Sequence, residues 1–318
     1  MCEDQLLIYN NRVIKKATIF TLLALFTGMV ILPYGQKEET PKRFTTNIDF
    51  KNQTINDDVR SDSQESSFWK NVLERGNGWF SQSFNLWRFY QNLANPSARY
   101  VVINSGLRKE EVAEIFAKEL KWNADQKYAL LSADKKLDKK NMEGRYSPGG
   151  YLVANSTEPE TVYQIIIKRF NREIRPRYAT STNEVVDMNL AIKIASIIER
   201  EAAGKRDMKL ISGIIWNRVF KNMKLEMDAT LQYAKGNSQN GWWPRVKPED
   251  KYIDSPYNTY KNIGLPPTPI SNVSAAAIIA ALNPQKTKCL FYLHDKLGMI
   301  HCSQTYKEHQ RNIKKYYR

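Results

Sequence analysis

A strongly apolar segment at residues 187–204 limits the possible folds of this chain more than any other stretch. Placed on a helix at about 100° per residue, its aliphatic and polar side chains separate onto opposite arcs. The aliphatic arc holds Leu190, Ile194, Ile197 and Ile198, and the polar arc holds Asn189, Lys193, Ser196 and Arg200. A helix with this pattern has to be covered by other elements along its aliphatic side, so the chain must build a core around it.

One carboxylate, Glu201, falls inside the aliphatic arc near the end of this predicted helix, whereas Glu199 lies at the edge of the arc. Contact with aliphatic side chains disfavours the charged form of a carboxyl group and raises its pKa, so Glu201 could stay protonated near neutral pH and act as a general acid. The alternative is a frayed helix end, where Glu201 turns into solvent or pairs with Arg200 or Lys205.

The amino-terminal region contains an apolar stretch at residues 17–32, preceded by Arg12, Lys15 and Lys16. In helical form it spans roughly 25 Å, close to the thickness of a hydrocarbon core. The basic residues favour a cytoplasmic amino terminus, with the rest of the chain on the other side of the membrane. A cleaved signal peptide is the alternative, but no small-x-small cleavage pattern follows. The prediction is a single uncleaved signal anchor in the cytoplasmic (inner) membrane.

The formal net charge of +15 indicates anionic partners. An extracytoplasmic domain weakens the nucleic-acid interpretation, and we expect no nucleic-acid partner. The same location permits a disulfide, and a cross-strand bridge between Cys289 and Cys302 is conceivable because both flank a predicted hairpin.

Periodicity predicts an α+β protein of 318 residues in four parts. These are a cytoplasmic amino terminus with the anchor (1–35), a linker and membrane-proximal segment (36–97), a small α+β subdomain (98–153) and a mostly helical domain with a β-hairpin (154–318). Short strands are predicted at 100–104 and within 142–152, helices at 109–122, 123–133, 158–174, 207–221 and 274–282, a hairpin at 290–301 and a basic helix from about Thr305.

The chain contains no glycine-rich phosphate loop, no metal-ligand spacing and no nucleophile elbow, so we expect neither a cofactor nor a metal. His294, His301 and His309 are interpreted as surface and hairpin residues. Asn217 interrupts an apolar helix and needs partners; it either orients a catalytic group or caps a neighbouring loop. The long loop at 236–254 contains two adjacent tryptophans, which argue against disorder.

Several motifs in the second half of the chain resemble those of the endolytic murein transglycosylases of the MltG (YceG-like) family. The matching residues are the run 195–202, Asn217 to Phe220, Met223, Leu225, Asp228, the run 255–260, the run 264–267, and Ala281, Asn283, Pro284, His301, Ser303, Tyr306, Glu308, His309 and Asn312. The match is dense over 143–312 and looser over 104–133.

The resemblance implies a membrane-anchored enzyme with a LysM-like subdomain and a lysozyme-like catalytic domain that cuts nascent peptidoglycan glycan strands without water. It implies that Glu201 is the catalytic acid and that cell-wall synthases are partners. Six further residues are predicted to bind or position the substrate: Asn217, Glu226, Asp228, Tyr257, Asn258 and Thr259.

Three positions depart from the family pattern: Glu226 replaces a common Gln, Ala229 a common Pro, and Thr268 a common Gly. An extra carboxylate at Glu226 could alter the pKa of Glu201. The alternative function is a catalytically weak, membrane-anchored scaffold that binds peptidoglycan, for which Glu201 would be dispensable.

Overall fold

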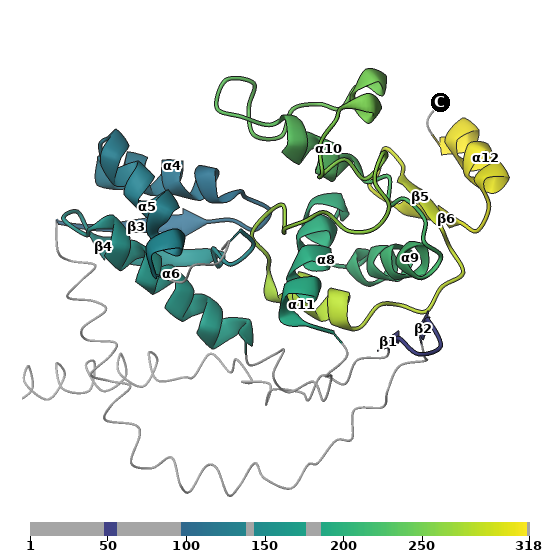
Figure 1. Cartoon of the computed structure of the whole chain (residues 1–318), viewed down its shortest axis with the longest axis horizontal. Helices are drawn as coiled ribbons and strands as arrows, with labels where there is room; N and C mark the ends of the chain where they lie inside the picture. Colours follow the sequence, from purple (N-terminus) through teal and green to yellow (C-terminus); the bar gives the residue numbers. More distant parts are fainter. Residues whose placement is uncertain (1–47, 56–96, 138–142, 176–185, 317–318) are drawn as a thin grey trace, which may run out of the picture. The chain divides into compact units, whose positions relative to one another are not determined.

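The structure, a computed structural model of the chain, describes residues 48–55, 97–137, 143–175 and 186–316 (Figure 1). All of these belong to one unit, Arg43–Arg318. The predicted anchor at 17–32 and the aromatic-rich segment at 68–93 lie outside the described residues. Within the described ranges, no helix combines the length and apolarity needed to cross a bilayer. The described part mixes helices and strands, which confirms the predicted α+β class.

The larger core is built around helix α8 (Met188–Glu201), which packs against α9 (Met208–Phe220) and α11 (Ala275–Leu282). The aliphatic arc of α8 is buried over Ile194, Ile197 and Ile198, as its periodicity predicts. Ser274 caps α11 by accepting the Ala277 N–H with its hydroxyl. The three helices together hold the carboxyl end of α8 in a fixed position.

A two-residue pair of strands, β1 (Ile48–Asp49) and β2 (Thr54–Ile55), also joins this core. The ring of Phe50 lies 5.3 Å from that of Trp216 on α9, and Ile48 and Ile55 are buried. The sequence predicts a linker or a loosely held strand here because aliphatic residues are few. The short hairpin thus packs three apolar side chains into the large core.

A smaller α+β unit has its own core. Strands β3 (Ala98–Ile103) and β4 (Gly149–Ala154) pair antiparallel, from Ala98 opposite Ala154 to Ile103 opposite Gly149. Helices α4 (Lys109–Leu120), α5 (Ala124–Leu137) and α6 (Pro159–Glu173) accompany this sheet. Alternate strand residues, including Val101 and Tyr151, are buried beneath the helices, whereas Tyr100 and Val102 are exposed.

Helix α6 contributes to both cores, although the predicted boundary at 153/154 assigns it to the large domain. Val162 and Ile166 pack in the small core, and Phe170 packs in the large one. The two cores are therefore joined by a continuous helix that contributes buried side chains to each of them.

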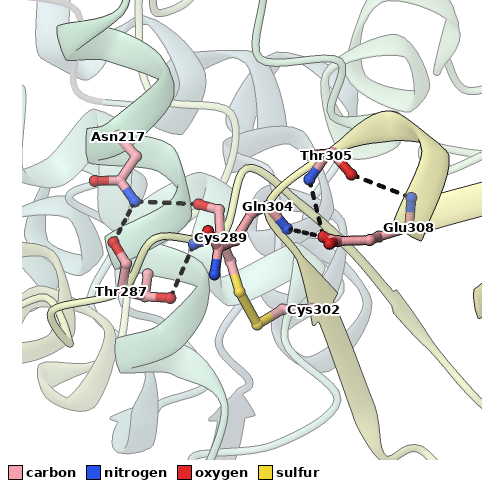
Figure 2. The surroundings of a disulfide bond; sticks show 7 residues. All are labelled: Asn217, Thr287, Cys289, Cys302, Gln304, Thr305 and Glu308. Atoms are coloured by element: carbon pink, nitrogen blue, oxygen red, sulfur yellow. Dashed lines mark hydrogen bonds between the residues drawn. A yellow bond between two sulfur atoms is a disulfide. The ribbon is translucent and has the colours of Figure 1, made fainter.

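The carboxyl-terminal part contains the predicted hairpin, with β5 (Phe291–His294) paired to β6 (Ile300–Ser303), followed by helix α12 (Tyr306–Tyr316). Figure 2 shows Cys289 and Cys302 joined by a disulfide at the base of this hairpin. The structure thus contains the disulfide that the sequence analysis left undecided. The bridge ties the segment before β5 to β6.

Two elements within the long connection after α9 are absent from the prediction. They are helix α10 (Asp228–Lys235) and the short 3₁₀ helix η2 (Pro248–Tyr252). Helix α10 packs against α8, and this contact places its first turn beside Glu201.

Candidate active site

The carboxyl group of Glu201 is held from two sides by hydrogen-bond donors. The backbone N–H of Ala229, in the first turn of α10, donates to Oε1 at 3.0 Å. The hydroxyl of Tyr292, on β5, donates to Oε2 at 2.8 Å. Glu201 is the last residue of α8, yet it neither turns into solvent nor pairs with Arg200 or Lys205, so the frayed-end alternative is wrong.

Burial of its carboxyl raises the pKa of Glu201 above the ordinary value for this side chain. The hydrogen bonds from Ala229 and Tyr292 act in the opposite direction because they stabilise the carboxylate, while the negative charge of Asp228 raises the pKa further. A carboxyl with a raised pKa, fixed in position by two donors, has the properties of a general acid.

Asp228 lies beside Glu201 at the start of α10 and is exposed. Its Oδ1 accepts a hydrogen bond from the Tyr260 hydroxyl at 2.6 Å. Burial and the neighbouring Asp228 raise the pKa of Tyr260, so its hydroxyl keeps its proton. The structure therefore brings Asp228 and the 255–260 loop to Glu201.

Asn258 and Thr259 are fully buried and organise this loop from within. The Asn258 amide donates to the carbonyls of Lys251 and Ile253 at 3.0 and 2.8 Å. The Thr259 hydroxyl accepts the Met227 N–H at 3.1 Å. Both side chains position the approach to Asp228, and direct substrate binding by either stays a prediction.

Tyr257 points to a different neighbour: its hydroxyl lies 2.8 Å from the hydroxyl of Thr268, and its ring lies 4.7 Å from that of Tyr233. Thr268 is one of the positions that the sequence analysis expects to differ from the family pattern. The contact fixes the 255–260 loop against the 264–268 segment.

Glu226 is exposed and pairs with Arg218, whose guanidinium reaches Glu226 Oε2 at 3.0 Å. The backbone of Glu226 has a φ of +51°, and its N–H donates to the Thr259 carbonyl. Arg218 is buried and also donates to the carbonyls of Leu290, Lys224 and Leu225. This arginine joins the start of the hairpin to the turn before α10.

Of the two interpretations of Asn217, the structure supports the one in which its side chain caps a neighbouring loop. Its amide donates to the carbonyls of Thr287 and Cys289, at 2.8 and 3.1 Å (Figure 2). It holds the segment that leads into β5, next to the disulfide. Its influence on Glu201 is thus through the position of the strand that carries Tyr292.

The two-tryptophan loop is ordered against the small unit, in agreement with the interpretation from the sequence. The indole N–H of Trp242 donates to Glu114 at 3.0 Å and that of Trp243 donates to Glu111 at 2.7 Å, both on α4. The guanidinium of Arg200 lies 3.8 Å from the Trp243 ring centroid. Because Arg200 precedes Glu201, this loop joins the small unit to the end of α8.

A second buried carboxyl, Glu143, lies between α4 and α10. Its side chain accepts the Lys109 N–H at 3.1 Å and the Tyr233 hydroxyl at 3.3 Å. Burial, reinforced by the negative charge of Glu110, raises the pKa of Glu143 to about 8. At neutral pH this carboxyl is therefore held in its neutral form.

We predict that Glu143 makes the protein less stable as pH rises. Between the usual pKa of 4.5 and about 8, the folded state keeps a proton that the unfolded state releases, so the free energy of unfolding falls through this window and levels off above it. For Glu143→Gln we expect this loss, up to about 5 kcal/mol, to disappear. Urea unfolding of both proteins between pH 5 and pH 9 measures it; parallel pH profiles would contradict the prediction.

Within the ranges that the structure describes, no group of three or more His, Cys, Asp or Glu side chains is arranged to hold a metal ion. His294 lies 2.7 Å from Asp207, and His301 lies 2.8 Å from Asp295. His309 stacks on Phe291. His294 and His301 lie in the hairpin strands, in agreement with the interpretation of the histidines as surface and hairpin residues, whereas His309 lies in α12.

Tyr292 contacts Glu201 directly and was missed by the sequence analysis. It is separated from Glu201 by most of the large domain's sequence, and the two meet only because β5 lies against the end of α8. Its place in the alternating strand β5 carried a signal, since Leu293 is buried and Tyr292 points to the other side. The alternation alone does not identify Glu201 as the carboxylate that Tyr292 contacts.

Comparison with known proteins gives three consistent similarities. The model of the YceG-like family matches residues 39–315. An endolytic murein transglycosylase of Bacillus subtilis (strain 168) is 29% identical over 291 residues, which cover 82% of this chain and 79% of that protein. One of Streptococcus pneumoniae serotype 2 (strain D39 / NCTC 7466) is 32% identical over 174 residues, which cover 54% of this chain and 32% of the streptococcal protein.

A solved structure is also similar. The crystal structure of a YceG-like protein from Listeria monocytogenes aligns with a TM-score of 0.59 and 28% sequence identity, covering 68% of this chain and 76% of that one.

Proposed function

This chain belongs to the YceG-like family, and from that premise we propose that it is an endolytic murein transglycosylase. In this proposal it cleaves the bond between MurNAc and GlcNAc inside uncrosslinked glycan strands and leaves 1,6-anhydro-MurNAc ends. The observation that supports it most directly is the carboxyl of Glu201, half-buried and held between the Ala229 N–H and the Tyr292 hydroxyl.

In the first step Glu201 acts as an acid. Each oxygen of the carboxyl accepts one hydrogen bond, Oε1 from the Ala229 N–H and Oε2 from the Tyr292 hydroxyl, so the acidic proton occupies a second lone pair. The carboxyl gives this proton to the glycosidic oxygen while the bond from that oxygen to C1 of MurNAc breaks. GlcNAc leaves with a new 4-hydroxyl, and positive charge develops at C1.

In the second step the same group acts as a base. The carboxylate now accepts both hydrogen bonds, takes the proton from the 6-hydroxyl of the same MurNAc, and the O6 electrons form the bond to C1. Glu201 is protonated again and no water is consumed. This cycle needs one carboxyl group, unlike the two-carboxylate scheme of ordinary glycosidases. Asp228 contributes negative charge that favours the protonated starting state.

Digestion of purified uncrosslinked glycan strands tests this function. The full chain should produce shorter strands by internal cuts from the first turnover, and mass spectrometry should find MurNAc ends that are one water lighter than reducing ends. Release of single disaccharides from strand ends would exclude an endolytic enzyme. Intact strands that still bind the protein would support the scaffold alternative instead.

We propose further that the large domain is lysozyme-like and the small unit around β3 and β4 is LysM-like and contacts the glycan strand. The apolar stretch at 17–32 supports a single-pass anchor in the cytoplasmic membrane, with the catalytic domain outside the cytoplasm. An enzyme in that position would limit the elongation of nascent strands beside cell-wall synthases, and co-purification from crosslinked membranes tests these partners.

Ala229 offers a test of how the site sets the pKa of its acid, because the family pattern has a proline there. Proline fits the first turn of a helix but lacks the N–H that reaches Glu201 in this chain. We expect Ala229→Pro to fold and to raise the pKa of Glu201, since a donor to the carboxylate is lost. The alkaline limb of the pH–rate profile should move to higher pH; a shift to lower pH would contradict this.

A matched control is available in the same helix. Thr230→Ser keeps the backbone donor of Ala229 and the hydroxyl contact with the Met227 carbonyl. Its alkaline limb should stay at the wild-type position.

A further inference from the structure

The turn between β5 and β6 exposes two large apolar side chains beside the end of α8. Leu297 is 88% exposed and Met299 is 49% exposed. The turn itself is rigid: Asp295 accepts the N–H groups of Leu297 and Met299, each at 2.9 Å. The ordered turn thus holds both apolar side chains in a position where they can contact a partner surface.

Cationic residues border this turn on its α8 side. A Cβ atom at Gly298 would lie 3.7 Å from Ala203, so the turn touches the 203–206 connection. That connection is fixed by Asp207, which accepts the N–H groups of Ala203 and Gly204. Its two remaining side chains, Lys205 and Arg206, are exposed.

The end of α12 borders the turn on the other side. His301 lies 2.8 Å from Asp295 and stacks on the Tyr316 ring with centroids 3.6 Å apart. Lys315 Nζ lies 4.9 Å from the centroid of the same ring, and Lys314 precedes it; both lysines are exposed. Lys296 in the turn is exposed as well.

The surface formed by Lys205, Arg206, Lys296, Leu297, Met299, Lys314 and Lys315 is called the turn patch below. Its charged members are all cations, and the neighbouring carboxylate, Asp295, has its pKa lowered by its hydrogen bond with His301 and by the backbone donors. A cationic rim around exposed aliphatic side chains complements an anionic lipid surface, with its phosphate headgroups above an apolar interior.

We propose that the turn patch docks on an anionic lipid bilayer, with Leu297 inserted at the headgroup boundary. An anionic polymer would pair with the cations but would leave Leu297 and Met299 in water. A lipid bilayer provides both anionic headgroups and an apolar interior, so it is the partner of the proposal. The contact is separate from the predicted amino-terminal anchor. Because the 203–206 connection follows Glu201 directly, docking holds the catalytic end of α8 close to the membrane, where nascent strands are made if the proposed function holds.

The test uses the full chain reconstituted into vesicles, with Cys2→Ser and a thiol-reactive, environment-sensitive fluorophore on Leu297→Cys. In phosphatidylcholine–phosphatidylglycerol vesicles the emission should shift to the blue and be quenched by lipids with brominated acyl chains. In phosphatidylcholine alone both effects should be absent. They should also be lost at about 1 M salt, where the Debye length falls to about 3 Å.

Two further variants sharpen the test. A label on Tyr252→Cys, which is 84% exposed and lies in η2 outside the turn patch, should stay in water in all vesicles. The combination Lys205→Glu, Arg206→Glu, Lys314→Glu and Lys315→Glu should abolish the response at Leu297→Cys. Both variants should cleave soluble glycan strands at the wild-type rate, so that a failure of docking is distinguished from a failure of the proposed function.

Three results would overturn the proposal. The label at position 297 could remain in water in anionic vesicles, or the label at position 252 could respond equally, which would indicate unspecific adsorption. Alternatively, soluble polyphosphate could produce the full shift without bilayers and bromolipids could fail to quench, which would assign the turn patch to an anionic polymer.

Discussion

Glu201→Gln should lower the rate of strand cleavage by about 1000-fold or more, because it removes both the proton donor and the later base. Glutamine has the same shape: its Oε1 can accept the Ala229 N–H, and its amide can donate to the oxygen of Tyr292. The variant should therefore fold and bind strands like the wild type. The measurement is the initial rate at which 1,6-anhydro ends appear.

Glu199→Gln is the matched control, since Glu199 lies two residues earlier on α8. Its carboxylate accepts the N–H and hydroxyl of Ser274 at 3.0 and 2.7 Å and fixes the start of α11, away from Ala229 and Tyr292. Its activity should remain within a small factor of wild type. Equal losses in the two variants would mean that α8 is merely being destabilised, and full activity of Glu201→Gln would leave the enzyme without its proposed acid.

Tyr292→Phe should lower the rate by about 10- to 100-fold, the effect of removing one hydrogen bond to a charged group in the second step. The lost donor stabilises the carboxylate, so the pKa of Glu201 should also rise and the alkaline limb of the pH–rate profile should move to higher pH. A rate loss with an unmoved profile would indicate a purely structural role for Tyr292.

Two comparisons separate positioning from folding for this tyrosine. Tyr306→Phe, on the exposed side of α12, should keep both the rate and the profile. In the Glu201→Gln background, Tyr292→Phe should cause little further loss, because the hydroxyl acts only through the carboxyl that is already gone. An additive loss would mean that Tyr292 acts on the substrate independently.

Helices α8, α9 and α11 were predictable because each one buries several aliphatic side chains. The 3.6-residue period over 187–204 and 207–221 locates α8 and α9 to within a few residues, and Ser274 marks the start of α11. The same period identifies Glu201 as the carboxylate on the buried side. Local pattern sufficed here because burial and helical geometry are both local properties of the sequence.

Helix α10 and the β1–β2 hairpin escaped prediction because their stability comes from distant partners. Helix α10 has eight residues, too few for a clear period, and it is held by its contact with α8 and by the Ala229 bond to Glu201. The β1–β2 hairpin depends on Phe50 meeting Trp216 on α9.

The site likewise combines a part that local sequence predicts with parts that depend on distant contacts. Its acid could be found from one helix, whereas its two donors come from α10 and β5, which approach α8 only in the folded chain. The disulfide between Cys289 and Cys302 depends similarly on strand register: Tyr292 pairs with Cys302, which places Cys289 beside β6. The strand register could not be derived from the sequence, so the sequence analysis left undecided whether Cys289 and Cys302 form a disulfide.

The central claim is that one carboxyl group cleaves the strand without water. Digestion in water enriched in the heavy oxygen isotope, followed by mass spectrometry of the new MurNAc ends, tests it most directly. The account predicts 1,6-anhydro ends that contain no heavy oxygen. Reducing ends that carry one heavy oxygen at C1 would mean that water attacks, and the chain would then be a hydrolase with a different mechanism.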